Sequence, residues 1–337
     1  MNTRVAILGA SGYTGLELLR LLLRHPGVEV TLLSTSRDET PAITTVHPQL
    51  TGLCDLHLQQ ASPGQIAEVA DCVFGCLPHA ASAAVMAELL SHGLKVVDLS
   101  ADYRLNDRDV YERWYGVTHP DAERLGKVPY GLPEFYRESI RGASLVANPG
   151  CYPTSAILAL GPLLREGLIR SEGIVVDSKS GVSGAGRNPK PAFHFPECNE
   201  SFAAYAVGAH RHMPEIDQVL SDVSGQQVEV LFAPHLVPMD RGILSTSYAQ
   251  PVGDLSTDKV LGALRAFYAA EPFVQVVDDL PATKHVSGTN RCHLTARVAR
   301  GKVIVVSVVD NLVKGASGAA VQNFNLLFDY EETTSLI

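Results

Sequence analysis

A strand, a glycine-rich turn and a helix follow one another within the first 25 residues. The apolar run at 4–8 ends at Gly9, and Gly12 and Gly15 open a leucine-rich stretch predicted as a helix over 14–25. Glycine permits the tight turn and lets the backbone approach a pyrophosphate, whose charge then lies against helix N–H groups. The spacing GxxGxxG is less common than GxGxxG. The strand–turn–helix context, however, is the one that a dinucleotide site requires.

Strands and helices continue to alternate through the first part of the chain. Apolar runs predict further strands at 28–34, 70–77 and 95–100, with a helix at 79–92 between the last two. Strands that alternate with helices are typical of a parallel, doubly wound sheet. The expected class is therefore α/β, with an N-terminal Rossmann-type domain.

The pattern changes near residue 148. Longer strands with fewer helices between them predict an α+β second domain on a mixed or antiparallel sheet. The last predicted helix, 315–328, is rich in small residues that permit close contact, and we expect it to pack on the first domain. The strands predicted in this part are 173–186, 227–238, 242–251 and 302–312, and its other helices are 154–167, 213–222 and 256–270.

Composition argues against several classes of function. The 337 residues include 27 Lys and Arg and 36 Asp and Glu, a net charge of −9 with no basic run, so a nucleic-acid surface is not expected. No stretch approaches the ~20 apolar residues of a membrane helix, and the N-terminus lacks a signal-peptide cleavage site. The six cysteines show no CxxC spacing, which indicates a reducing compartment and no zinc site. We expect a cytoplasmic protein with no membrane partner.

The residues after the second strand indicate which dinucleotide binds. An NAD site expects an acidic residue there, but this chain has Ser34, Thr35 and Ser36 followed by Arg37. Hydroxyl groups and a forked guanidinium suit the 2′-phosphate of NADP(H). A solvated loop arginine is the alternative, and NADP(H) is the favoured cofactor.

One cysteine, Cys151, lies between two prolines at the mouth of a predicted helix. Pro149 and Pro153 restrict the backbone on either side, and Thr154 or Ser155 is expected to cap the helix that follows. A thiol at a helix N-terminus feels the positive end of the helix dipole, which favours the reactive thiolate. A single cysteine more often packs than reacts. A dinucleotide fold before it favours covalent thioester chemistry at the aldehyde oxidation level.

Thiol chemistry of this kind needs a proton partner, and the segment "VGAHRHMPEI" offers two. His210 and His212 flank Arg211, ahead of a helix opened by Pro214. A histidine can take the thiol proton and later protonate an oxyanion. Histidines two residues apart also occur in metal sites, but the sequence holds no third ligand nearby. Surface or capping histidines are the remaining alternative.

A third segment suggests anion binding. The loop at 178–189 interleaves glycines with serines and carries Lys179 and Arg187, so it can present backbone N–H groups and hydroxyls to an anion. A flexible turn is the alternative. Arg104 and Arg211 are further candidates, because each lies beside another site segment.

These segments together resemble the N-acetyl-γ-glutamyl-phosphate reductase family, NADPH-dependent enzymes of arginine biosynthesis related to aspartate-semialdehyde dehydrogenase. The resemblance covers nearly the whole chain, and its cysteine and two-histidine segments are its most specific parts. It is carried by "GASGYTGLELLRLL", "HPQL", "LPHAAS", "VVDLSADYRL", "YGLPE", "ANPGCYPT", "SGVSGAGR", "HRHMPEI", "HLVPMDRGIL" and "KGASGAAVQN".

The resemblance implies roles for the candidate residues. Cys151 would be the nucleophile and either His210 or His212 the acid/base, while the segment 315–318 and Asn323 would lie near the nicotinamide. Substrate-binding candidates are Arg104, Asn148, Ser183 and Arg211. Cofactor-binding candidates are Gly9, Ser11, Gly12, Tyr13, Thr14, Gly15, Ser36, Arg37, Leu77, Pro78, Ser180, Gly181, Gly184, Asn311, Lys314 and Gly315.

The resemblance also implies an organisation and a reaction. Residues 1–148 and 312–337 would form the NADP-binding domain, and residues 149–311 a catalytic and dimerisation domain of a homodimer or homotetramer. The reaction would reduce an acyl phosphate to N-acetylglutamate semialdehyde through a cysteine thioester, releasing inorganic phosphate. The alternatives are an aminoadipyl or aspartyl phosphate as substrate, or a non-catalytic NADP(H)-binding regulator.

Overall fold

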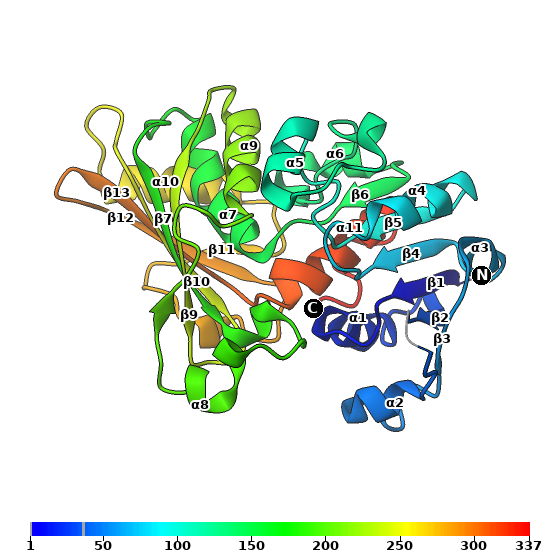
Figure 1. Cartoon of the computed structure of the whole chain (residues 1–337). Coiled ribbons are helices and arrows are strands. Elements are labelled where there is room, and N and C mark those ends of the chain that lie inside the picture. The colour runs from blue at the N-terminus through cyan, green and yellow to red at the C-terminus, as the bar shows by residue number, and fades with distance from the viewer. Residues whose placement is uncertain (1, 36–37) are drawn as a thin grey trace. The chain divides into compact units, whose positions relative to one another are not determined.

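The computed structural model describes residues 2–35 and 38–337, and the chain divides into two compact units (Figure 1). Unit 1 comprises Met1–Pro149 and Ala316–Ile337, and unit 2 comprises Gly150–Gly315. The C-terminal segment thus returns to the unit that the N-terminus begins.

Within the described residues, unit 1 is built on a six-stranded sheet in the order β3-β2-β1-β4-β5-β6. Each pair of neighbouring strands is parallel, which confirms the predicted doubly wound α/β class. Its strands are β1 (Thr3–Leu8), β2 (Val28–Ser34), β3 (Leu58–Gln59), β4 (Cys72–Gly75), β5 (Lys95–Asp98) and β6 (Leu145–Ala147).

Helices cover both faces of this sheet (Figure 1). Ala6 and Leu8 of β1 belong to a core that includes Met86 and Leu89 of α4, whereas Val146 of β6 packs with residues of α6 and α11 on the other face. This alternation follows the period of two along a strand. The helices of unit 1 are α1 (Tyr13–Leu22), α2 (Ile43–Val46), α3 (Pro63–Val69), α4 (Ala83–Ser91), α5 (Arg108–Tyr115), α6 (Pro133–Ile140) and α11 (Gly318–Leu327).

The helix predicted at 79–92 begins four residues later than expected. The buried carboxylate of Asp102 accepts hydrogen bonds from the backbone N–H groups of Ala80, Ser82 and Ala83, at 2.7 to 3.0 Å. These bonds hold the preceding residues in a turn, with Ala80 at a φ of 65°. The acceptor lies about twenty residues away, so local propensity does not reveal it.

Within the described residues, unit 2 is built on a seven-stranded mixed sheet in the order β11-β12-β13-β10-β7-β9-β8. Two pairs are parallel, β7 with β9 and β11 with β12, and the others are antiparallel, as the predicted class requires. Its strands are β7 (Ile174–Gly181), β8 (Ala203–Ala204), β9 (Val230–Val237), β10 (Ile243–Ala249), β11 (Val274–Val276), β12 (Cys292–Ala299) and β13 (Lys302–Val309).

Three helices pack on one face of the unit 2 sheet. Val176 of β7, Phe232 of β9 and Val305 of β13 are fully buried on this side, and the alternate strand residues on the opposite face are mostly half-buried or exposed. The helices are α7 (Cys151–Arg165), α9 (Met213–Ser224) and α10 (Thr257–Phe267), with a short α8 (Phe195–Cys198).

Several predicted boundaries in unit 2 were wrong. The first predicted strand stops at Gly181, because Val182–Ala185 form a 3-10 turn, and the last stops at Val309. The helix predicted from 315 is preceded by a π-helical turn over Val313–Ser317. Strands β8, β11 and β12 were not predicted.

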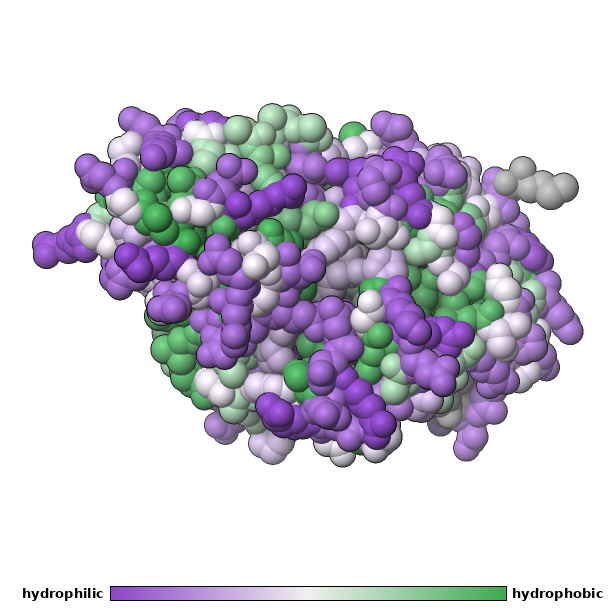
Figure 2. All heavy atoms as spheres, turned by 90° about the horizontal axis from the view of Figure 1, so that it is seen from above, coloured by the Kyte–Doolittle hydropathy of each residue, from purple (hydrophilic) through white to green (hydrophobic). Residues whose placement is uncertain are grey.

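One face of the molecule is shown in Figure 2, where hydrophilic residues predominate and hydrophobic ones form scattered groups. Among the residues that the structure describes, no helix is both long and apolar enough to cross a bilayer.

Candidate active site

The glycine turn of unit 1 depends on the absence of side chains. Gly9 has a φ of 74°, and a Cβ built on it would lie 2.5 Å from the carbonyl oxygen of Cys76, so only glycine fits. A Cβ on Gly15 would lie 2.6 Å from the carbonyl oxygen of Ala10. That same carbonyl lies 3.1 Å from Nε2 of buried His47, which holds the turn from outside.

The N-terminus of α1 fits the pyrophosphate of a dinucleotide. Its N-cap is Gly12, and among the described residues no side chain caps the helix. A Cβ built on Gly12 would lie 3.7 Å from the carbonyl oxygen of Gly9, so glycine is not needed here to avoid a clash. The missing side chain instead leaves open space at the start of the helix. No acidic residue lies in the first turn, so N–H groups and the helix dipole favour an anion there. The other predicted residues of this turn, Ser11, Tyr13 and Thr14, are half-buried beside it.

The cofactor specificity prediction rests on residues without a described structure. Ser36 and Arg37 lie outside the described residues, so their proposed contact with a 2′-phosphate stays a prediction. Leu77 and Pro78 follow the carboxyl end of β4, the edge of a parallel sheet where ligands bind in this fold class.

Arg104 and Asn148, two of the predicted substrate-binding residues, are both buried in unit 1. Nε of Arg104 donates to the carbonyl oxygen of Asn148 at 2.8 Å, and Nη2 donates to that of Leu99 at 2.8 Å. The Asn148 amide donates to the carbonyl of Ala316 at 3.1 Å and accepts from Asn323 at 3.0 Å. These bonds fix the backbone that leads to Cys151, and direct substrate contact by either residue stays a prediction.

In unit 2, Cys151 is the first residue of α7. Gly150 is the N-cap and, among the described residues, no side chain caps this helix. The expectation that Thr154 or Ser155 caps it was wrong, because the helix starts three residues earlier than predicted. The Thr154 hydroxyl donates back to the carbonyl of Gly150 at 2.9 Å, and that of Ser155 donates to Tyr152 at 2.9 Å. The half-buried thiol therefore lies at the positive end of a 15-residue helix.

A buried glutamate that was not predicted from the sequence joins this turn to the histidine segment. Glu215, in the first turn of α9, accepts a hydrogen bond from the backbone N–H of Gly150 at 2.8 Å. Its side chain is almost fully buried. A glutamate directly after Pro214 at the start of a helix is the local signal, but its partner lies 65 residues away in the sequence.

The two histidines pack against Tyr152, the residue after Cys151. The ring centroid of Tyr152 lies 5.6 Å from that of His210 and 5.9 Å from that of His212, and the two imidazoles are 4.8 Å apart. The structure therefore brings both predicted histidines to the start of α7. Arg211, between them, is exposed.

The ring of His210 is held by protein contacts in a buried environment. Burial, with a smaller contribution from Arg211, lowers the pKa of His210 to about 4, so its ring is neutral at pH 7. Its Nδ1 accepts from the backbone N–H of His212 at 3.1 Å, which places the ring proton on Nε2, 3.5 Å from the Tyr205 hydroxyl. Both nitrogens of His210 therefore contact protein groups.

The serine- and glycine-rich segment at the end of β7 is held in part by hydrogen bonds to other segments of unit 2. Ser183 is buried, donates to the carbonyl of Asp240 at 2.6 Å and accepts from Asn311 at 3.0 Å. Ser180 is also buried and donates to the carbonyl of Gly181 at 3.0 Å, whereas Gly184 is exposed. Ligand contacts by this loop stay a prediction.

Lys314 lies inside unit 2. Its side chain is fully buried, and its ammonium lies 5.5 Å from the ring centroid of Phe273. The expected contact of this lysine with the cofactor stays a prediction. Among residues 2–35 and 38–337, no group of three or more His, Cys, Asp or Glu side chains has an arrangement that could hold a metal ion.

Two family models match the chain in succession. The NAD binding domain of semialdehyde dehydrogenase matches residues 4–143, and the dimerisation domain of semialdehyde dehydrogenase matches residues 151–311.

Solved structures of similar fold include aspartate semialdehyde dehydrogenases. The Vibrio cholerae enzyme II complexed with ASA has a TM-score of 0.74 at 18% identity, and covers 98% of this chain and 99% of its own. The Candida albicans enzyme with NADP has a TM-score of 0.70 at 16% identity, with 96% and 98% covered. At this identity the likeness establishes the fold alone.

Curated relatives are much closer in sequence. The N-acetyl-gamma-glutamyl-phosphate reductase of Rhodopirellula baltica is 50% identical over 341 residues, which cover 100% of this chain and 99% of the relative. That of Magnetococcus marinus is 51% identical over 337 residues, with 99% and 97% covered. Identity at this level over whole chains, together with the two domain matches, shows that this chain belongs to the N-acetyl-gamma-glutamyl-phosphate reductase family.

Proposed function

We propose that this chain catalyses the NADPH-dependent reduction of N-acetyl-L-glutamyl 5-phosphate to N-acetyl-L-glutamate 5-semialdehyde, with release of phosphate, in arginine biosynthesis. The observation that carries the proposal is the placement of Cys151. It is half-buried at the N-terminus of α7, and two imidazoles pack on the residue that follows it. Membership of the family indicates the substrate, and the position of Cys151 indicates which residue would bind its acyl group covalently.

In the proposed mechanism, the Cys151 sulfur attacks the carbonyl carbon of the acyl phosphate, the carbon–oxygen bond to phosphate breaks, and a thioester forms. The N-terminus of α7 stabilises the attacking thiolate. NADPH, when bound, supplies a hydride to the carbonyl carbon. The resulting hemithioacetal oxyanion collapses with breakage of its carbon–sulfur bond, which releases the semialdehyde and regenerates the thiolate. Exposed Arg211 would attract the phosphate group.

We assign the acid/base role to His212 and a positioning role to His210. Both ring nitrogens of His210 contact protein groups, and its lowered pKa, about 4, makes it a poor proton donor at neutral pH. Its Nδ1 instead accepts from the backbone N–H of His212 and so fixes the start of α9. Glu215, on the same helix, accepts a hydrogen bond from the backbone N–H of Gly150. This bond holds the histidine segment in a fixed position relative to Cys151.

The cofactor proposal assigns the pyrophosphate to the N-terminus of α1, with Gly12 leaving room for it. Gly9 and Gly15 would shape the turn. Ser36 and Arg37 would bind the 2′-phosphate and favour NADPH over NADH.

The substrate and cofactor proposals are tested together in the reverse direction. Purified protein is mixed with phosphate, NADP⁺ and either N-acetylglutamate semialdehyde, its one-carbon-longer homologue or aspartate semialdehyde. We expect phosphate-dependent formation of NADPH with N-acetylglutamate semialdehyde at the highest kcat/KM, and a lower kcat/KM with NAD⁺. A higher kcat/KM for either other aldehyde would contradict the substrate assignment.

We further propose that unit 2 mediates a homodimer through the open face of its sheet. Strand registers place Leu231 opposite Val175, Val175 opposite Tyr248, and Tyr248 opposite Ile304. Directly opposed residues lie on the same face of a sheet, so these four apolar side chains form a row across β9, β7, β10 and β13. Leu231 is 55% exposed and Tyr248 37% exposed. A second copy would bury this row, in keeping with the dimerisation-domain match.

Leu231→Arg is expected to convert the dimer to monomers, because it places a charge in the apolar row. Sedimentation equilibrium measures the change in mass. Leu280→Arg is the matched control, since Leu280 in the same unit is somewhat more exposed than Leu231, at 63%, but lies in a loop. An unchanged mass for Leu231→Arg would show that this face is not the interface.

A further inference from the structure

Gly315 approaches the proposed nucleophile more closely than any side chain would allow. A Cβ built on Gly315 would lie 2.9 Å from Cβ and 3.3 Å from Cα of Cys151, and 3.1 Å from the carbonyl oxygen of Asp310. The backbone of Gly315 does not have a positive φ, so its conformation does not itself require glycine. Space beside Cys151 is therefore what requires glycine here.

The backbone around Gly315 has an unusual but fixed shape. Val313–Ser317 form a π-helical turn, and the N–H of Gly315 donates to the carbonyl of Asp310 at 2.9 Å. Such turns are rare and occur frequently at functional sites. This turn places Gly315 against the first residue of α7.

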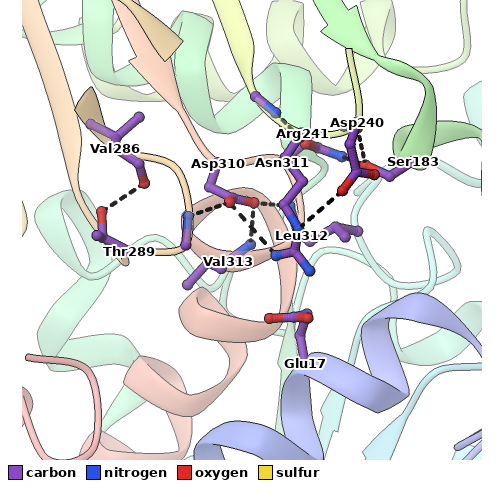
Figure 3. Close-up of polar contacts among 12 residues, drawn as sticks. Glu17, Ser183, Asp240, Arg241, Val286, Thr289, Asp310, Asn311, Leu312 and Val313 are labelled. Carbon is purple, nitrogen blue, oxygen red and sulfur yellow. Dashed lines mark hydrogen bonds and ion pairs between the residues drawn. The ribbon is translucent and has the colours of Figure 1, made fainter. Parts of the chain in front are cut away.

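The carboxylate of Asp310 holds the start of this turn (Figure 3). It is fully buried, and one oxygen accepts from the N–H groups of Leu312 at 2.8 Å and Val313 at 3.2 Å. The other oxygen accepts from the N–H of Gly288 at 2.7 Å and lies 3.7 Å from Nη1 of Arg241. A carboxylate with acceptor contacts on both oxygens resists displacement.

The next residue, Asn311, anchors the turn to two more loops (Figure 3). Its Oδ1 accepts from the N–H of Gly242 at 2.7 Å, and its Nδ2 donates to the Ser183 hydroxyl at 3.0 Å. Ser183 in turn donates to the carbonyl of Asp240 at 2.6 Å. The turn that carries Gly315 is therefore tied to the segments that follow β7 and precede β10.

We propose that Gly315, held by Asp310, is a positioning residue that sets the location of the Cys151 side chain for acyl transfer. The proposal rests on the proposed role of Cys151 as nucleophile. Because the Asp310 turn is anchored on several sides, a methyl group at position 315 would displace Cys151 rather than the turn. A displacement of about 1 Å at a reacting group can cost about 10²-fold in rate.

The test compares Gly315→Ala with Gly262→Ala. Gly262 lies in α10, and among the described residues a Cβ there would meet no atom within 4 Å apart from the adjacent backbone of its own helix. We expect Gly315→Ala to lower kcat by about 10²-fold while the KM for NADPH stays near that of wild type. Gly262→Ala should keep both values. A rise in the KM for NADPH with unchanged kcat would overturn the proposal in favour of a cofactor-binding role for Gly315.

Two further measurements make the outcome decisive. Acyl transfer to Cys151 is followed in a rapid-quench experiment and expressed per folded molecule, so that a loss of stability alone does not mimic the effect. Asp310→Asn places an amide in contact with N–H donors and should slow the same step. If Gly315→Ala does not fold, Asp310→Asn carries the test, and a wild-type acylation rate in folded Asp310→Asn would contradict the proposal. If Gly315→Ala turns over at the wild-type rate while Cys151→Ser is inactive, only the positioning role of Gly315 is refuted. If Cys151→Ser is active, the proposed function itself is refuted.

Discussion

Replacing Cys151 with serine is expected to abolish semialdehyde formation, with a fall in kcat of at least about 10⁴-fold, the scale seen when a catalytic nucleophile is removed. A serine hydroxyl stays protonated at neutral pH, whereas a thiol ionises far more easily because its ordinary pKa is much lower. Steady-state assay of NADPH oxidation with the acyl phosphate measures the change.

The matched control for this prediction is cofactor binding. Cys151 lies in unit 2 and the glycine turn in unit 1, so the dissociation constant for NADPH should not change in Cys151→Ser. Cys198→Ser, which alters a half-buried cysteine in the exposed helix α8, should retain wild-type kcat. Substantial turnover by Cys151→Ser would remove the covalent step from the mechanism.

Replacing His212 with asparagine is expected to lower kcat by about 10²- to 10⁴-fold, the usual contribution of a general acid or base. His210→Gln should have a smaller effect, because His210 acts through the backbone N–H of His212. We expect the smaller loss of kcat for His210→Gln because the His210 ring nitrogens contact protein groups and its pKa is lowered to about 4.

The pH dependence of kcat/KM separates these two roles. The limb of the kcat/KM profile that reflects titration of the acid/base group should disappear in His212→Asn. In His210→Gln the same limb should persist at reduced amplitude. The opposite result, with the limb lost in His210→Gln and kept in His212→Asn, would exchange the two assignments.

The sequence predicted those parts of the fold in which local pattern and tertiary contacts agree. The strand, glycine turn and helix at the N-terminus have apolar periodicity and glycines whose backbones must approach neighbouring carbonyls. Strands of two or three residues, such as Leu58–Gln59 and Leu145–Ala147, carry too little pattern to be recognised. The true start of α4 depends on the distant carboxylate of Asp102, which no local rule identifies.

Residues of the candidate site could be proposed from the sequence where they lie within short motifs. Cys151, His210 and His212 were found from their neighbours, and the structure brings all three to the start of α7. Glu215 was missed because its partner, Gly150, is distant in sequence. The contact of Gly315 with Cys151 was missed for the same reason. The sequence shows that residue 315 has no side chain, but only the fold shows which atoms a side chain there would meet.

Formation of the thioester on Cys151 is measured by the mass of the intact protein after mixing with N-acetylglutamyl phosphate in the absence of NADPH. We expect a mass increase of one N-acetylglutamyl group, located on the peptide that contains Cys151 and discharged when NADPH is added. An active enzyme that forms no such adduct, or that carries it on another residue, would contradict a covalent mechanism through Cys151.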